Sequence, residues 1–415
     1  MPTSSSARVF TERSEPQRAF RPGRSTSGFF LAAVVYLTRL LRAGADDHLD
    51  YRFAAYREDA GRISVETHTW LFEQKLISWL SLKGEAVYDA ISGATPTGAP
   101  PPAQVSILGA PPGPGSTTVP IQQMHDLRWA GSLDAEISLG AHRITPQFSY
   151  SSEHDYRSSG AALNYSLDLN EKNTTLNLGW AHAWDRVLGS PAGFLRRART
   201  KDTDTFLIGV NQLLGPRTTL TVNLSGGSSH GYLNDQYRGV LFNDYPQTDP
   251  SNLALFGERR PSHRNTYIGY VALTHFVTPL NGSTETTYRF YHDTYGINAH
   301  TIGLAWHQKI GSMLMVSPQF RYYQQSAATF YASRYAGDPS DPTNPTPIPS
   351  FYSADYRLSH METLTYGVDL TAKAASWLSF DAGYKRYVIR GLDGGTSQSA
   401  YPDANIFTVG MRLWF

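Results

Sequence analysis

Apolar side chains occupy every second position at the C-terminal end of the chain. They are Phe407, Val409, Met411, Leu413 and Phe415, with Thr408, Gly410 and Arg412 between them. Successive side chains of an extended strand point to opposite faces. The pattern therefore predicts a terminal β-strand with one apolar face and one small or polar face.

The same alternation is clearest between residues 127 and 139. One face carries Leu127, Trp129, Gly131, Leu133, Ala135, Ile137 and Leu139, and the other carries Arg128, Ser132, Asp134, Glu136 and Ser138. Residues 80–89 repeat the pattern. A soluble β-sandwich or propeller also alternates, but it does not predict a second face this rich in charge. Apolar residues opposite charged ones predict a transmembrane antiparallel β-barrel with a polar lumen.

Short and long connections between these segments alternate along the chain. Short ones fall near residues 74–76, 139–141, 170–172, 214–216, 278–283, 310–312 and 373–376. Longer ones fall near residues 92–123, 187–202, 231–263, 330–356 and 391–403, with smaller ones on the same side near residues 58–61, 152–158 and 296–297. Outer-membrane barrels have short periplasmic turns and long extracellular loops, which predicts about 16 strands here, with 14 or 18 as alternatives. An even number places both ends of the barrel in the periplasm.

Composition is consistent with an outer-membrane barrel. Hydrophobic residues make up 40% of the chain and mean hydropathy is −0.36, which excludes a bundle of transmembrane helices. Aromatic residues reach 13%, which suits girdles at the membrane interfaces. The chain has no cysteine, which excludes disulfides and thiol chemistry. A net charge of +1 without a basic stripe gives no reason to expect nucleic acid as a partner.

The N-terminal region has the features of a secretory leader. Residues 28–37 form an apolar stretch of signal-peptide length after several arginines, and Ala43-Gly44-Ala45 is a candidate cleavage site. We therefore expect a leader and signal peptide over residues 1–45 and a single barrel domain over residues 46–415. The leader before Gly28 is long, which is compatible with a start codon placed upstream of the true one.

Charged residues on the polar faces are the candidates for lining the lumen. They are Lys83, Glu85, Asp89, Asp126, Arg128, Asp134, Glu136, Arg143, Asp168, Glu285, Arg289, Asp293, Arg321, Asp369, Lys373, Asp381 and Lys385. Charges inside a membrane must face water or one another. Two readings stay open: a salt-bridged wall without selectivity, or a hydrated passage with a slight preference for cations.

The loop at residues 92–123 is rich in proline and glycine, so it cannot form a helix or a core of its own. It either folds inward as a constriction or extends into solvent. A motif at the start of this loop includes Asp89, Ser92, Gly93, Thr95 and Pro96. We expect this motif at the outer mouth, as a candidate for gating or for contact with a partner.

Catalytic and metal-binding patterns are weak. No H-E-x-x-H or G-x-S-x-G occurs, although separate strands could still bring a serine, a histidine and an acid together. Nine of the 13 histidines are His68, His125, His142, His154, His182, His230, His263, His292 and His300. They mostly fall near predicted strand ends, where an amphipathic ring suits the headgroup region. We expect no cofactor, no metal and no enzymatic activity.

One stretch resembles a known family. Residues 66–76 (Glu66-Thr67-His68-Thr69-Trp70 onward) and residues 89–98, with Asp89-Ala90-Ile91-Ser92-Gly93-Ala94-Thr95, are similar to the bacterial family of unknown function DUF3570. The resemblance runs from about Asp46 to Phe415. It implies an outer-membrane barrel without assigned activity. Family genes often neighbour those for a flavin transferase, a thioredoxin-like protein and a small lipoprotein, which implies a redox-related envelope partner.

The expected function is a porin-like channel for small solutes in the outer membrane of a Gram-negative bacterium. A non-conducting scaffold or binding barrel for an envelope partner is the alternative, and an outer-membrane hydrolase is the third. The expected partners are outer-membrane lipid and the barrel-assembly machinery. An apolar last strand ending in an aromatic residue resembles the insertion signal of such barrels, here Met411, Leu413, Trp414 and Phe415.

Overall fold

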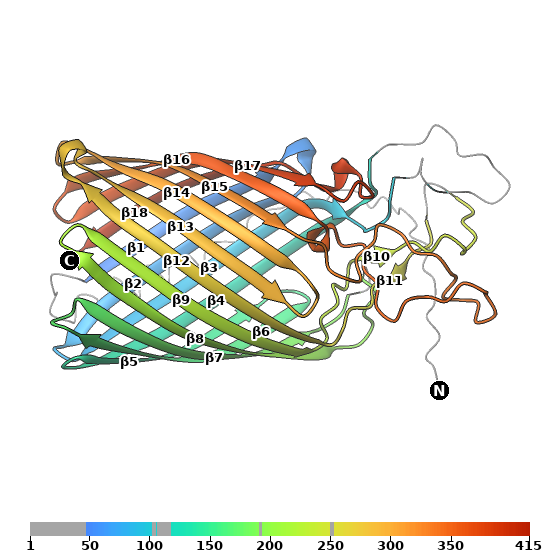
Figure 1. Cartoon of the computed structure of the whole chain (residues 1–415), viewed down its shortest axis with the longest axis horizontal. Coiled ribbons are helices and arrows are strands. Elements are labelled where there is room, and N and C mark those ends of the chain that lie inside the picture. The colour runs from blue at the N-terminus through green and yellow to red at the C-terminus, as the bar shows by residue number, and fades with distance from the viewer. Residues whose placement is uncertain (1–46, 102–104, 106–117, 191–192, 250–252) are drawn as a thin grey trace, which may run out of the picture.

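A computed structural model describes residues 47–101, 105, 118–190, 193–249 and 253–415. Within these residues, sixteen strands close into one antiparallel barrel (Figure 1). The barrel strands are β1 (His48–Glu58), β2 (Ser64–Ile77), β3 (Leu80–Pro96), β4 (Ile121–Leu139), β5 (His142–Ser152), β6 (Tyr156–Leu169), β7 (Thr174–Val187), β8 (Arg199–Gly215), β9 (Thr218–Gly231), β12 (His263–Val277), β13 (Gly282–Asp293), β14 (Asn298–Ile310), β15 (Leu314–Gln325), β16 (Met361–Ala375), β17 (Leu378–Gly391) and β18 (Ala404–Trp414). The predicted fold and strand number are confirmed. No helix in the described part of the chain is long and apolar enough to cross a membrane.

Every barrel strand pairs with its neighbour along the chain, and the ring closes between the first and last strands. β1 pairs with β18 from His48 opposite Trp414 to Glu58 opposite Ala404. The start of β1 and the end of β18 therefore lie together, at the end that carries the short turns (Figure 1). The backbone amide of Phe415 donates to the carbonyl of Asp47 at 3.1 Å.

Several predicted boundaries are wrong by a few residues; the loop after β15, for example, spans 326–360 and not 330–356. β2 continues to Ile77 instead of turning near residues 74–76, because its pairing with β3 extends through Lys75 opposite Ser81 to Ile77 opposite Leu80. β3 reaches Pro96, which pairs with Ile121, so the connection is 97–120 and not 92–123. Within that connection, residues 102–104 and 106–117 lie outside the described residues, as does the expected leader at 1–45.

The outer surface of the barrel wall is apolar. Large apolar side chains that a soluble protein would bury are exposed along the strands, including Phe148 (70%), Phe206 (59%) and Leu224 (58%). Exposed Trp79 and Trp377 mark the turns between β2 and β3 and between β16 and β17. A closed wall with an apolar exterior and aromatic residues at its rim is suited to lipid. The protein is an outer-membrane β-barrel.

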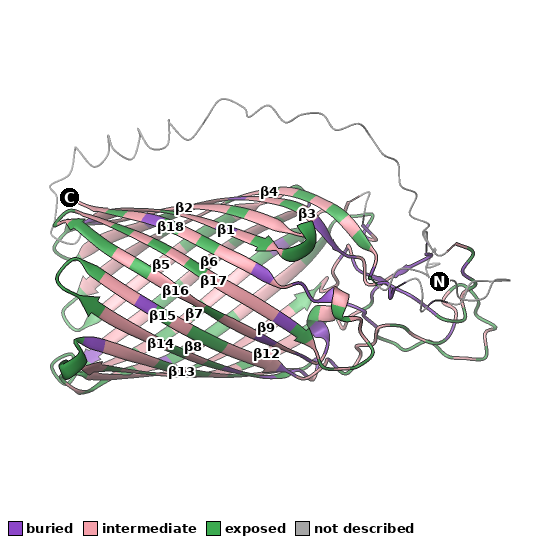
Figure 2. Cartoon of the chain, turned by 90° about the horizontal axis from the view of Figure 1, so that it is seen from above, coloured by how far each residue is buried: buried purple, intermediate pink, exposed green. Residues whose placement is uncertain are grey.

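The long loops fold together at the opposite end of the barrel, and we call this assembly the cap. Its described parts are residues 97–101, 105, 118–120, 188–190, 193–198, 232–249, 253–262, 294–297, 326–360 and 392–403. The cap includes the small sheet of β10 (Gly239–Val240) and β11 (Phe256–Gly257) and the short 3-10 helices η4 (Tyr356–Leu358) and η5 (Gln398–Ala400). Buried residues gather in this region, whereas the walls are largely half-buried or exposed (Figure 2).

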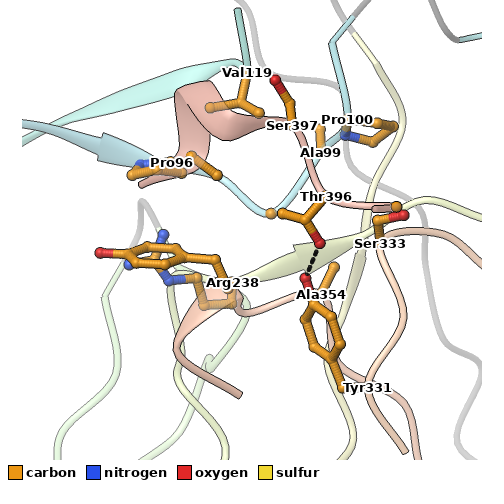
Figure 3. A pocket seen from close by; sticks show the side chains of 14 residues that line it. Pro96, Ala99, Pro100, Val119, Arg238, Tyr331, Ser333, Ala354, Thr396 and Ser397 are labelled. Atoms are coloured by element: carbon orange, nitrogen blue, oxygen red, sulfur yellow. Dashed lines mark hydrogen bonds between the residues drawn. The ribbon is translucent and has the colours of Figure 1, made fainter. Parts of the chain in front are cut away.

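Apolar side chains from different loops form the core of the cap. One cluster joins Ala99 and Val105 to Leu241, Leu253 and Leu255. A second cluster packs Phe242 edge-on against Phe256 and Tyr352. A cavity of about 20 Å³ lies where Pro96, Arg238, Tyr331 and Thr396 converge from four segments of the chain. Figure 3 shows these side chains. The cap is therefore a packed substructure, which the sequence did not predict.

Candidate functional site

The strand register relates the seventeen predicted lumen residues to one another. Directly paired residues of an antiparallel sheet point to the same face. Lys83 pairs with Asp134, and Asp89 pairs with Arg128, while the exposed apolar residues of β4 take the alternate positions. The same relation holds for the rest of the set on their own strands. The register places all of these side chains on the inward face.

Cross-strand ion pairs bind many of these charges together. The N–O distances include Arg128–Asp89 at 2.5 Å, Arg143–Asp168 at 2.6 Å, Lys385–Asp369 at 3.3 Å and Arg52–Asp381 at 3.6 Å. Lys83 Nζ lies between two carboxylates, 3.1 Å from Glu73 and 3.7 Å from Glu136. Pairing lowers the cost of holding charge at membrane depth.

Other inward charges have no such partner. Within the described residues, the following form no ion pair: Glu85, Asp126, Asp134, Arg289, Arg321 and Lys373. Sequence reasoning also left out several inward charges, namely Asp50, Arg52, Glu73, Asp185, Lys201, Arg264 and Arg412. Asp50, Arg52 and Arg264 lie in the first and tenth barrel strands, and Glu73, Asp185 and Lys201 lie beside or within predicted connections. Extending the period of two to each strand end would have found them.

Inward charges of opposite sign gather on opposite walls. The wall of β3 and β4 carries five acids and two bases: Glu85, Asp89, Asp126, Asp134 and Glu136 against Lys83 and Arg128. The wall of β12 to β15 carries Arg264, Arg289 and Arg321 against Glu285 and Asp293. Five strands separate β4 from β12 in the ring, and five separate β15 from β3. A charged solute in the lumen therefore meets an acidic wall facing a more basic one.

The loop between β9 and β12 holds the cap together, and we call residues 232–262 the crossing segment. Its backbone or side chains bond to loops around the ring: Gly239 to Thr97, Gln236 to Asp155, Phe194 to Gln236, Asn243 to Tyr335, Arg259 to Tyr352 and Tyr295 to Pro261. The backbone amide of Gly239 donates to the carbonyl of Thr97 at 2.7 Å, although their strands lie nearly half a ring apart. The crossing segment thus spans the outer mouth.

A buried ionic network fastens the crossing segment to the loop that follows β15. The Arg357 Nε donates to Asp355 Oδ1 at 2.9 Å, and the Arg260 Nη2 donates to Asp355 Oδ2 at 2.8 Å. Arg260 also contacts Glu258 Oε1 at 2.7 Å, and Arg357 bonds to Asp235. Burial acts to raise the pKa of Asp355, but Arg357, Arg238 and Arg260 outweigh burial and hold that pKa well below its usual range. Asp355 therefore stays ionised.

Glu258 responds to burial in the opposite way. Burial raises the pKa of Glu258 to about 7, although Arg260 opposes the rise. The negative charges of Asp355 and Asp235 lie nearby and raise the pKa of Glu258 further. Glu258 Oε2 also accepts a hydrogen bond from the Ser353 hydroxyl at 2.5 Å. Because the folded cap favours the protonated form of Glu258, ionisation of this carboxyl near neutral pH destabilises the cap.

We expect the cap to lose stability as the pH rises. The folded cap binds a proton on Glu258 up to about pH 7, whereas the unfolded chain releases it near 4.5, so this contribution is present below pH 4.5 and lost through pH 7. The shift corresponds to about 3 kcal/mol. Limited proteolysis of the cap between pH 5 and 8.5, corrected for protease activity on an unfolded substrate, measures the loss. In Glu258→Gln the proteolysis rate should not vary across this range, and an unchanged slope would contradict the assignment.

The motif from Asp89 to Pro96 joins the barrel wall to the cap. Asp89 is buried and paired with Arg128, and Ser92 pairs with Ser64 and His125. Gly93 has a φ of +116°, and a Cβ there would lie 2.0 Å from the Arg62 carbonyl oxygen, so only glycine fits. Thr95 Oγ1 accepts a hydrogen bond from Arg238 Nη2 of the crossing segment at 2.9 Å. The motif is thus an attachment point of the cap.

Two further groups of side chains carry atoms that can ligate a metal ion, namely a carboxylate cluster at the end of β4 and the outward histidines of the barrel wall. Oxygens of Asp126, Glu153 and Asp155 lie within 4.8 Å of one another near the outer end of β4. Outward histidines sit among aromatic rings: His300 Nδ1 lies 2.8 Å from the Tyr288 hydroxyl, for example.

The C-terminal strand keeps the alternation predicted from the sequence. On β18, Met411 and Leu413 take the same alternate positions as the exposed Phe407 and Val409, facing away from Arg412.

The sequence of this barrel matches one family. The profile described as "Protein of unknown function (DUF3570)" covers residues 29–399, which is most of the chain. The chain belongs to the DUF3570 family. The resemblance found in residues 66–98 is therefore confirmed over almost all of this DUF3570 barrel. No curated protein is significantly similar to it.

Solved structures similar to the DUF3570 barrel are distant. They include the siderophore receptor PirA from Pseudomonas aeruginosa, with 10% identity, a TM-score of 0.43 and coverage of 89% of this chain and 61% of the receptor. A bacterial polysaccharide outer membrane secretin has 8% identity, a TM-score of 0.46 and coverage of 89% and 98%. OmpT, an outer membrane protein of Vibrio cholerae, has 11% identity, a TM-score of 0.42 and coverage of 90% and 99%. The chain spans 53–61% of the siderophore receptors it matches. Likenesses at this level carry no argument about activity.

Proposed function

We propose that this protein is a porin-like conduit for small polar solutes whose outer opening is restricted by the cap. The supporting observation is the inward face, which carries acidic and basic side chains along a closed wall of sixteen strands. A barrel of this strand number leaves an aqueous lumen unless something fills it. The inward charges then act on the solute as it passes.

Single-channel conductance tests this proposal. The protein is purified from outer membranes in detergent and inserted into planar bilayers under a potassium chloride gradient. We expect small, steady conductance steps, because the crossing segment spans the mouth. A folded barrel that gives no conductance, with or without the crossing segment, would reject the conduit.

The cap supports a second candidate, a non-conducting barrel that binds an envelope partner or ligand. A packed core and a buried ionic network across the mouth suit a lid that stays closed. Under this alternative, the intact protein gives no conductance, and conductance appears only when the crossing segment is removed. The same bilayer recordings therefore separate the two candidates.

A further inference from the structure

A second cavity lies on the lumen side of the cap. Its volume is about 300 Å³, and it is lined by inward residues of β12 to β15 together with residues of the cap. Four arginines line it, namely Arg260, Arg264, Arg289 and Arg357, and Tyr291 and Tyr323 add two aromatic rings. Asp355 is the one carboxylate among the described lining residues. The cavity thus combines a strong excess of guanidinium groups with a volume suited to a small molecule.

The carboxylates near this cavity are already occupied. Asp355 is 1% exposed and accepts hydrogen bonds from Arg260 and Arg357. Asp293, behind the lining, is fully buried and accepts from Arg264 Nε at 2.9 Å, from the Tyr291 hydroxyl at 2.7 Å and from two backbone amides. Asp355 and Asp293 are thus already paired with other arginines and have little capacity left to neutralise the charge of Arg289.

Arg289 is the lining arginine without an acidic partner. Within the described residues, its guanidinium makes no ion pair, and its recorded contact is with the Tyr291 ring, 5.4 Å from the ring centroid. Arg321, also unpaired there, lies 5.7 Å from the Tyr323 ring on β15. A half-buried guanidinium without a carboxylate is costly unless an anion or water satisfies its donors. The free donors of Arg289 therefore point to an anionic ligand.

We propose that this cavity binds the carboxylate or phosphate group of a small anionic solute. Guanidinium groups hold such planar or tetrahedral oxyanions through paired, charge-assisted hydrogen bonds. Arg289 supplies the main contact, and Arg264 and Arg357 face the same space with part of their donors. The inference deepens the proposed conduit by naming its solute class, and it rests on that function for its physiological meaning.

Calorimetric titration of the purified protein in detergent tests the site without requiring conduction. The probes are inorganic phosphate and succinate, added at constant ionic strength. We expect saturable binding, weakened about tenfold or more in Arg289→Gln because one charge-assisted contact is lost. Arg289→Lys keeps the charge but not the paired geometry, and its affinity should fall between the two. Arg197→Gln removes the same charge from an exposed part of the cap and should leave affinity unchanged.

The outcomes separate the alternatives. Tighter binding of phosphate identifies a phosphorylated solute, and tighter binding of succinate identifies a carboxylate. Absence of saturable heat with both probes overturns the site, as does an equal loss of affinity in Arg289→Gln and Arg197→Gln. Folding of each variant is checked by its heat-dependent migration in detergent gels. Binding without any conductance would keep the site and reject the conduit, so the two proposals fail separately.

Discussion

Replacing residues 231–262, which comprise Gly231 and the crossing segment, with a two-residue Asn-Gly turn should raise the single-channel conductance severalfold. His230 pairs with His263, so a tight hairpin can join β9 to β12 without disturbing the ring. The replacement removes the segment that forms hydrogen bonds with five other loops of the cap. Those loops then no longer have a common partner across the mouth. The mouth of a sixteen-stranded barrel is then limited by its wall.

A deletion of residues 339–345 is the matched control for this experiment. These residues form the mostly exposed tip of the loop after β15, away from the contacts of Tyr335 and Tyr352 with the crossing segment. Conductance of this control should equal that of the intact protein. Equal conductance of the intact protein and the crossing-segment variant would show that the cap does not restrict passage.

Asp355→Asn should make the cap far more sensitive to protease while the barrel stays folded. Asp355 is buried and bonds to both Arg260 and Arg357. Loss of its charge leaves the buried guanidinium of Arg260 and the half-exposed guanidinium of Arg357 partly uncompensated, at a cost of about 3 kcal/mol. If cleavage follows reversible opening of the cap, its rate should rise by about two orders of magnitude or more.

The measurement is limited proteolysis of the folded protein in detergent, with heat-dependent gel migration as the readout of the barrel. Asp338→Asn is the matched control. Asp338 caps a turn in the same loop through the Ser340 amide at 2.8 Å, and asparagine can make that bond as well. A cap that is as resistant in Asp355→Asn as in the intact protein would show that the ionic network does not hold it closed.

The barrel could be predicted from the sequence because its strands obey a local rule. Apolar and polar residues alternate in β3, β4 and β18 whichever strands lie beside them, and the even strand number follows from the spacing of turns. The inward position of a residue such as Asp134 or Arg289 needs only this alternation.

The cap could not be predicted in the same way. Residues such as Val240, Phe256 and Tyr352 are brought together from distant loops, and no periodicity marks such contacts. Arg289 stood in the sequence as one of several inward bases. Its lack of an acidic partner depends on Asp293, four residues along, which is taken by Arg264 of the neighbouring strand. Which charges remain unpaired is decided by register and by the cap, and a single sequence shows neither.

Pairing of β1 with β18 also has a consequence for biogenesis. The ion pair between Asp50 and Arg412 joins residues 362 positions apart, so the ring cannot close until the end of the chain has been delivered. Pairing over such separations is slow, even though the entropy of closing a loop grows only with the logarithm of its length. In the interval the growing sheet has two unpaired edges, which readily recruit other chains. We therefore expect a periplasmic chaperone to shield both edges until β18 has been translocated and paired with β1.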